Sequence, residues 1–225
     1  MPDIVSNIRI LKENIPSSVK LVAVTKTKSI DEILAAYKSG HKVFGENRVQ
    51  ELLSKKDLLP ADIEWHLIGH LQTNKVKYIV SFISMIQSVD TFKLLKIINS
   101  EAVKINRVID CLLQIHIARE ETKYGFSMTE LDDMFQSEEF KKLYSLRICG
   151  VMGMATFTED NYQIKQEFRN LADSFYELKN KYFQERSYFK EISMGMSGDY
   201  KIALEEGSTI VRIGSLIFGK RNSKN

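Results

Sequence analysis

The sequence has little cysteine and no long apolar run, and each shortage excludes a class of protein. The two cysteines among 225 residues, Cys111 and Cys149, lie in apolar stretches without CxxC spacing, so we interpret them as core residues rather than disulfide or metal partners. The four histidines are scattered without the spacing of a zinc site. No apolar stretch reaches the roughly 20 residues of a membrane helix, and the first residues contain no signal core. We therefore expect a cytoplasmic protein without a metal site or a membrane anchor.

Charge is also modest, with a net charge of +3, a pI near 8.7 and no block of like charges. This balance does not predict binding to nucleic acid or to an anionic membrane, and we interpret the basic residues 220–225 as a solvated terminus. The content of 44% hydrophobic and 27% charged residues is typical of a globular domain. Because a (β/α)8 barrel needs roughly 200 to 250 residues, we expect residues 1–225 to form one domain.

Segments typical of strands and of helices alternate along the whole chain. The expected strands are residues 21–26, 42–45, 65–69, 85–89, 110–118, 146–155, 192–196 and 209–218. Most are apolar throughout, which is typical of a parallel sheet covered by helices. Capping-box patterns at Ser29 and Ser127 and a cap at Asp90 predict helix starts, and the apolar spacing from Ile164 to Tyr182 predicts a helix with one buried stripe.

The stretch from residue 191 onward predicts a phosphate site. Ser197 and Gly198 follow an apolar strand and precede a short helix at 200–206, whose first turn offers free N–H groups to an anion. The alternative is that this serine only caps the helix.

The strand expected at 209–218 is apolar except for Arg212, Gly214 and Ser215. A buried strand rarely carries an arginine without a partner, so Arg212 either belongs to a site or is paired with a core carboxylate. A phosphate site between the last two strands is a recurrent feature of closed barrels. We therefore favour an α/β fold with a single (β/α)8 TIM barrel over an open doubly wound sheet.

The first expected strand, residues 21–26, ends in Lys26. First and last strands are neighbours in a closed barrel, so this lysine would lie near the phosphate site. An amine held among apolar residues loses proton affinity and can attack an aldehyde. Function gathers at the C-terminal ends of barrel strands, a rule that also selects Asn47 and His66.

Several motifs resemble those of a known family. They are AVTKTKS at 23–29, FGENRVQE at 44–51, WHLIGHLQTNK at 65–75, GVMGMA at 150–155, SMGMSGDY at 193–200 and GSTIVRIGSLIFG at 207–219. In this order and spacing they resemble the YggS/PROSC family of pyridoxal phosphate homeostasis proteins, from about residue 20 to residue 221. The resemblance implies a barrel like the alanine racemase N-terminal domain, with pyridoxal 5'-phosphate as cofactor.

The same resemblance implies a role for each main site residue. Lys26 would form the Schiff base with the cofactor, Ser197, Gly214 and Ser215 would hold its phosphate, and Arg212 would lie against its pyridine nitrogen. An arginine donates to an unprotonated nitrogen, which leaves the ring a weak electron sink.

Other residues keep two interpretations each. Asn47 would position the ring or cap the next helix, and His66 would line the pocket or be a core histidine. Lys75 and Lys123 match lysines of the family pattern or are solvated charges, and Lys28 is expected to be a solvated loop residue.

We expect a cofactor carrier with little or no turnover, since the racemases of this fold use a second base from a further domain and this chain ends directly after the last strand. The expected partners are pyridoxal phosphate and the apo-enzymes that receive it, and the expected state is a monomer. The alternatives are a racemase-type enzyme, a Schiff-base aldolase and a barrel with a vestigial site. His116 and Ala118 replace polar residues usual in the family and change the expected pocket.

Overall fold

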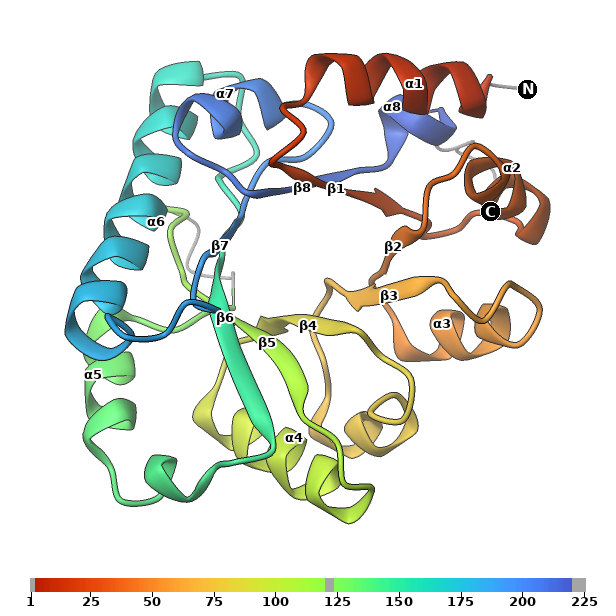
Figure 1. Cartoon of the computed structure of the whole chain (residues 1–225). Coiled ribbons are helices and arrows are strands. Elements are labelled where there is room, and N and C mark those ends of the chain that lie inside the picture. Colours follow the sequence, from red (N-terminus) through yellow and green to blue (C-terminus); the bar gives the residue numbers. More distant parts are fainter. Residues whose placement is uncertain (1–2, 120–123, 220–225) are drawn as a thin grey trace.

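Eight parallel strands close on themselves in chain order in the computed structural model, which describes residues 3–119 and 124–219 (Figure 1). The strands are β1 Lys20–Val24, β2 Val43–Glu46, β3 Glu64–Leu67, β4 Met85–Val89, β5 Ile109–Gln114, β6 Leu146–Met152, β7 Glu191–Ser193 and β8 Ile210–Ile213. The barrel closes where β1 pairs with β8, with Val22 opposite Arg212. The predicted closed barrel is therefore confirmed, and the open sheet is excluded.

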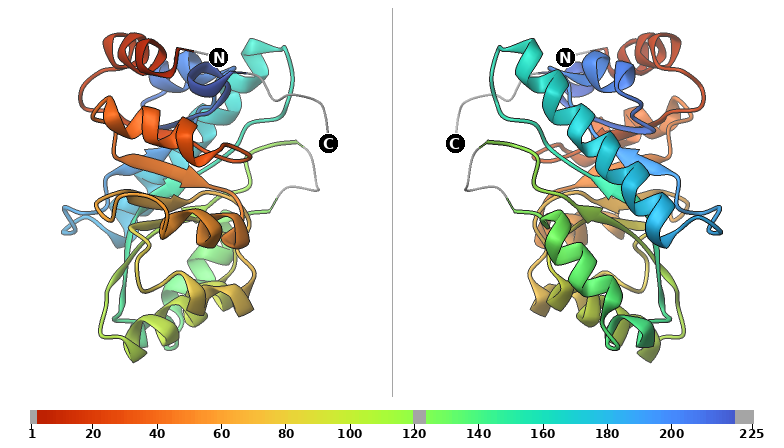
Figure 2. Two further views of the ribbon diagram at one scale, coloured as in Figure 1. Left: turned by 90° about the vertical axis from the view of Figure 1, so that its right-hand side faces the viewer. Right: turned by 90° about the vertical axis from the view of Figure 1, so that its left-hand side faces the viewer.

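Helices follow the strands and surround the barrel, as the side views show (Figure 2). They are α1 Ile4–Asn14, α2 Ile30–Lys38, α3 Val49–Lys56, α4 Phe92–Lys104, α5 Met128–Gln136, α6 Asn161–Tyr182, α7 Tyr200–Glu205 and α8 Ser215–Phe218, with 3-10 turns η1 Thr73–Tyr78 and η2 Phe140–Lys142. The predicted stripe of α6 is buried from Ile164 to Leu178. No helix within residues 3–119 and 124–219 is long and apolar enough to cross a membrane.

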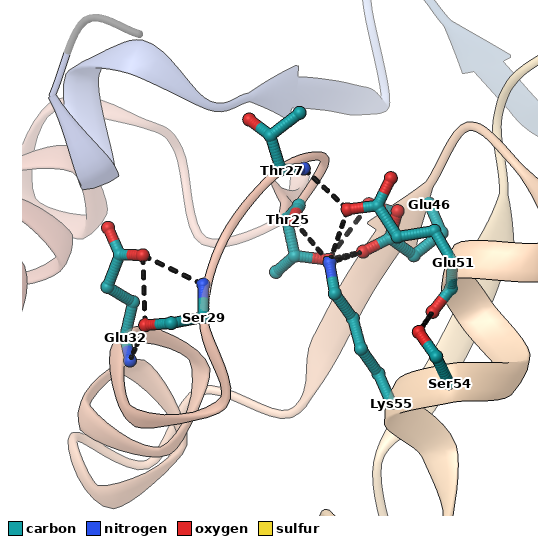
Figure 3. Close-up of polar contacts among 9 residues, drawn as sticks. Thr25, Thr27, Ser29, Glu32, Glu46, Glu51, Ser54 and Lys55 are labelled. Carbon is teal, nitrogen blue, oxygen red and sulfur yellow. Dashed lines mark hydrogen bonds and ion pairs between the residues drawn. The ribbon is translucent and has the colours of Figure 1, made fainter. Parts of the chain in front are cut away.

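Side-chain caps explain where several helices begin. Capping boxes open α2 at Ser29, which exchanges hydrogen bonds with Glu32 (Figure 3), and α5 at Ser127. The predicted cap at Asp90 is wrong, because the Thr91 hydroxyl accepts the Leu94 N–H at 3.2 Å. The Asp90 carboxylate instead lies 2.8 Å from Nδ1 of His70.

Six of the eight strands end earlier than the sequence predicts, and the differences are largest at β5 and β8. The strand expected at 110–118 ends at Gln114, and Ile115 after it forms an isolated bridge with Phe126 of the returning loop. The strand expected at 209–218 ends at Ile213, and Gly214 then caps the short helix α8. A short apolar run is typical of a buried strand and of a buried helical turn alike, which is why the strand predicted from the sequence is too long.

Apolar side chains fill two layers. The larger cluster lies between the strands and the helices and includes Cys111. A smaller cluster consists of residues that alternate along the strands with members of the larger one, so it fills the barrel interior: Val22, Met85, Leu112, Cys149, Met152 and Ile210. Both cysteines are buried free thiols, as expected for core residues.

The junction between β7 and β8 has little strand pairing. In the described chain the two strands share one register pair, Ser193 with Ile210. Hydroxyl groups supplement it: Thr209 Oγ1 accepts the Ile192 N–H at 2.8 Å, and Ser208 Oγ donates to the Met194 carbonyl at 2.8 Å. Three backbone hydrogen bonds also join these segments, from Thr209 to Ile192, from Met194 to Ile210 and from Arg212 to Gly195, so hydroxyl groups add to a short backbone pairing.

Candidate cofactor site

A chain of buried polar side chains crosses the barrel from β8 to β3. Arg212 donates to Ser193 Oγ at 2.6 Å and to the Gly153 carbonyl at 3.0 Å. Ser193 then donates to Gln87 Oε1 at 2.6 Å, which places the Gln87 amide nitrogen 2.8 Å from Nδ1 of His66. Because each group donates to the next, the chain has one direction, from Arg212 to His66.

Burial determines the charge states of the groups in this series of hydrogen bonds. It lowers the pKa of Arg212 to about 10, against the opposing attraction of Asp199, so the guanidinium stays charged at neutral pH. The two groups that accept its hydrogen bonds are neutral, and no carboxylate in the described residues forms an ion pair with it, so the alternative of a core arginine paired with a carboxylate is wrong. Burial lowers the pKa of His66 to about 3, aided by the positive charge of Lys20. His66 is therefore neutral, and since its Nδ1 accepts from Gln87, its proton lies on Nε2.

Lys26 lies at the C-terminal mouth of the barrel, in the turn that follows Val24. Its side chain is half-buried, and its ammonium forms no hydrogen bond or ion pair within residues 3–119 and 124–219. Gly214 packs against the same strand end, since a Cβ atom there would lie 3.3 Å from the Val24 carbonyl oxygen. The end of β8 therefore lies directly beside the turn that carries the lysine.

The predicted phosphate residues meet at this mouth. The Gly214 N–H donates to Ser197 Oγ at 3.2 Å, which joins the loop after β7 to the start of α8. Ser197 is half-buried, and Ser215 is exposed in the first turn of α8. The structure thus brings Lys26, Ser197, Gly214 and Ser215 to neighbouring strand ends, with Arg212 two residues before Gly214 on β8.

Asn47 also lies at the mouth, half-buried just after β2. Its backbone packs against Gly69, where a Cβ atom would lie 2.5 Å from the Asn47 carbonyl oxygen. The cap residue of α3 is Arg48, so the interpretation of Asn47 as a helix cap is wrong.

Lys28 differs from its expected solvated role. Its ammonium donates to the Phe218 carbonyl at 3.0 Å and lies 3.3 Å from a Glu32 carboxylate oxygen, with its side chain only 13% exposed. It therefore connects the start of α2 to the end of α8, whereas Lys26 has no such partner in the part of the chain that the structure describes.

Three of the remaining candidates follow β3 and β5 along the chain. Lys75 is half-buried in η1 with its ammonium 5.7 Å from the centre of the Tyr78 ring, and Lys123 lies outside the described residues. His116 and Ala118 follow the end of β5 and so lie in the loop above the barrel rather than on the strand.

Gln87 and Ser193, which connect Arg212 to His66, were missed by the sequence interpretation. The available signal was a polar side chain inside a run of buried apolar residues, the same signal that selected Arg212. Neither residue has a motif of its own, because each gains its role from a partner on a distant strand.

Replacing Gln87 with leucine is expected to lower the free energy of unfolding by about 2 to 4 kcal/mol, because Ser193 and His66 would each lose a buried hydrogen bond. Urea unfolding would measure this loss. Met85→Leu on the same strand is the matched control, since a buried apolar exchange of similar volume costs under about 1.5 kcal/mol. Equal stability of the two variants would contradict a role for the buried hydrogen bonds from Arg212 to His66 in stabilising the barrel.

Comparison with known proteins identifies the family. The family model for the alanine racemase N-terminal domain matches residues 2–222. The pyridoxal phosphate homeostasis protein of Aquifex aeolicus is 40% identical over 203 residues, which cover 90% of this chain and 87% of that protein. This chain belongs to the pyridoxal phosphate homeostasis protein family.

Solved structures agree with this membership of the family. PipY of Synechococcus elongatus, solved without pyridoxal phosphate, superimposes with a TM-score of 0.89 at 31% identity over 96% of this chain and 100% of PipY. The structure of PipY with pyridoxal phosphate bound gives a TM-score of 0.87 at the same identity and coverage. The predicted family and fold are both confirmed.

Proposed function

We propose that this protein binds pyridoxal 5'-phosphate and serves in its homeostasis, holding the cofactor as a Schiff base on Lys26 with little or no turnover. The observation that carries the proposal is the meeting of three kinds of group at one barrel mouth. Lys26 supplies an amine that has no partner among the described residues, Arg212 a buried charge whose hydrogen-bond acceptors are neutral, and Ser197 a hydroxyl beside the Gly214 N–H.

This set of donors fits the chemistry of the cofactor. An aldehyde needs an amine, and a phosphate needs hydroxyl and backbone N–H donors. Ser197 and Ser215 carry hydroxyl groups, and Gly214, whose N–H donates to Ser197 Oγ, lies beside them. Among the described residues, a Cβ atom at Gly198 would have no neighbour within 4 Å, so the loop is open at this point. The homeostasis protein of Aquifex aeolicus and the PipY structure with pyridoxal phosphate bound support the assignment of this cofactor.

Arg212 is the residue that favours a carrier over an enzyme. Pyridoxal phosphate is a strong electron sink when its ring nitrogen is protonated, which a carboxylate at that nitrogen maintains. Arg212 remains a donor at neutral pH and forms no ion pair with a carboxylate in the described chain, so it would meet an unprotonated nitrogen. The relatives carry the name of homeostasis proteins, which agrees with this role.

We assign two further residues supporting roles. Asn47 would border the ring from the β2 side of the mouth, where its backbone packs against Gly69. His66 would act through Gln87 and Ser193 on the orientation of Arg212, because its Nδ1 is already engaged in the buried chain.

The test is an absorbance spectrum of the purified protein with added pyridoxal phosphate, before and after borohydride reduction. Wild type is expected to show the band of a Schiff base at the edge of the visible range, and reduction should fix the cofactor on Lys26. Lys26→Ala should show neither. Lys28→Ala is the control, since this nearby lysine already donates to Phe218 and pairs with Glu32.

Two results would contradict the proposal. A wild-type protein without the band, even with excess cofactor, would exclude the cofactor site. Steady racemisation of an amino acid that disappears in Lys26→Ala would favour the racemase-type enzyme instead. Transfer of the bound cofactor to an apo-enzyme, followed by the recovery of that enzyme's activity, would test the carrier role.

A further inference from the structure

A buried lysine on α3 contacts the turn that carries Lys26. The ammonium of Lys55 lies 2.8 Å from the Thr25 carbonyl oxygen and 2.7 Å from a carboxylate oxygen of both Glu46 and Glu51 (Figure 3). Its side chain is only 8% exposed, and these three contacts use all three ammonium protons. Such burial of a lysine is rare without complete pairing, so the arrangement is specific.

The carboxylates that bind Lys55 also bind the residues on either side of Lys26. The Thr25 hydroxyl donates to Glu46 at 2.6 Å, and the Thr27 N–H donates to the same Glu51 oxygen that contacts Lys55, at 2.5 Å (Figure 3). The peptides before and after Lys26 are therefore both tied to the Lys55 ammonium, one directly and one through Glu51.

Thr27 shows why the turn needs this support. Its φ of +64° lies in the left-handed region, which a β-branched residue rarely adopts. A turn in this conformation persists only where surrounding contacts hold it, and the Glu51 carboxylate holds the Thr27 N–H.

We propose that Lys55 is a positioning residue for Lys26: with Glu46 and Glu51 it fixes the turn so that the Lys26 amine is presented to an aldehyde in one orientation. This inference rests on the proposed role of Lys26. It assigns a function to a lysine that touches no part of the cofactor site itself and acts only through the backbone at Thr25 and Thr27.

The central variant is the double substitution Glu46→Gln with Lys55→Met. Lys55→Met alone would leave the buried Glu46 carboxylate without its counter-charge, whereas the double variant removes both charges and keeps the buried volume. Lys56→Met is the matched control, because this neighbour on α3 pairs with Asp57 at the surface. Should the double variant not fold, Glu51→Ala replaces it, since Glu51 is partly exposed and its loss leaves the Glu46–Lys55 pair intact.

Two measurements separate positioning from a purely structural role. In the cofactor-free protein, hydrogen exchange of the Thr27 amide is expected to speed up at least about tenfold in the double variant and in Glu51→Ala. In the second measurement, pyridoxal phosphate and borohydride label the protein, and the labelled peptide is identified by mass. Labelling at Lys26 is expected to slow between about tenfold and about a hundredfold, because small displacements of a reacting group have effects of this size.

The outcomes are distinct. Faster exchange with slower labelling, both absent in Lys56→Met, would support the inference. Unchanged exchange in a folded variant, or wild-type labelling despite faster exchange, would overturn it while leaving the proposed function in place. Absence of label at Lys26 in the wild-type protein would instead overturn the proposed function, and this inference with it.

Discussion

Between pH 6.5 and pH 4.5, the protein is expected to lose about 5 kcal/mol of its free energy of unfolding, because two buried histidines are neutral in the fold and charged in the unfolded chain. Burial lowers the pKa of His66 to about 3 and that of His41 to about 4, from an ordinary value of 6.5. Stabilities of native proteins are typically about 5 to 15 kcal/mol, so this loss could unfold the protein.

The sign follows from proton uptake. Below pH 6.5 the unfolded chain binds protons at both histidines, whereas the folded chain binds them only near the lowered pKa values. Stability is therefore fully present above pH 6.5 and falls as the pH falls, by about 2.5 kcal/mol for each histidine at pH 4.5.

Urea unfolding of the cofactor-free protein at a series of pH values would measure this dependence. His41→Gln keeps a donor for the Val43 carbonyl, which His41 Nε2 contacts at 2.8 Å, and is expected to remove about half of the loss. A stability that stays flat from pH 6.5 to pH 4.5 would show that both rings are protonated within the fold.

Gly150→Ala is expected to destabilise the barrel by at least about 4 kcal/mol, because the new side chain has no space and no suitable backbone conformation. Gly150 has a φ of +152° and lies opposite Glu191 in the β6–β7 pairing. A Cβ atom there would overlap the Glu191 carbonyl oxygen, which belongs to backbone and cannot rotate away. The two strands would have to separate.

This separation would also reach the candidate site. Ser193 follows Glu191 on β7, and the Gly153 N–H donates to the Ser193 carbonyl at 3.0 Å, so both partners of Arg212 depend on the same pairing. Urea unfolding and cofactor binding should therefore weaken together. Gly40→Ala is the control, since its φ of +82° imposes the conformational cost without any atom within 4 Å. Equal losses for the two variants would show that the close contact at Gly150 is unimportant.

The sequence predicted the strand cores and the helix starts well, because apolar runs and capping patterns are local. It failed at strand ends: the run through Ile217 and Phe218 is as apolar as the strand before it, although these residues form α8 and pack on the rest of the core. Only the tertiary packing decides where such a strand stops.

The candidate site could likewise be predicted only in part. Lys26 and Arg212 could be selected from the sequence because a polar residue at the end or middle of a buried strand is unusual. Gln87 and Ser193 could not be given roles, because their partners lie on strands that become close only when the barrel forms. Lys55 could not be given one either, because one of its partners is a backbone carbonyl group, which has no signature in the sequence. Whether the selected residues bind the cofactor stays a prediction.

The junction between β7 and β8 gives the barrel a preferred place for local unfolding. It has one register pair, the fewest of any neighbouring strands in the described ring, besides three backbone hydrogen bonds and the hydroxyl bonds. Ser197 and Gly214, which continue these two strands, face each other across it. A phosphate bound to both residues would link β7 to β8 and oppose local unfolding of the barrel at this junction. Occupancy of the site and cooperativity of unfolding would therefore rise together.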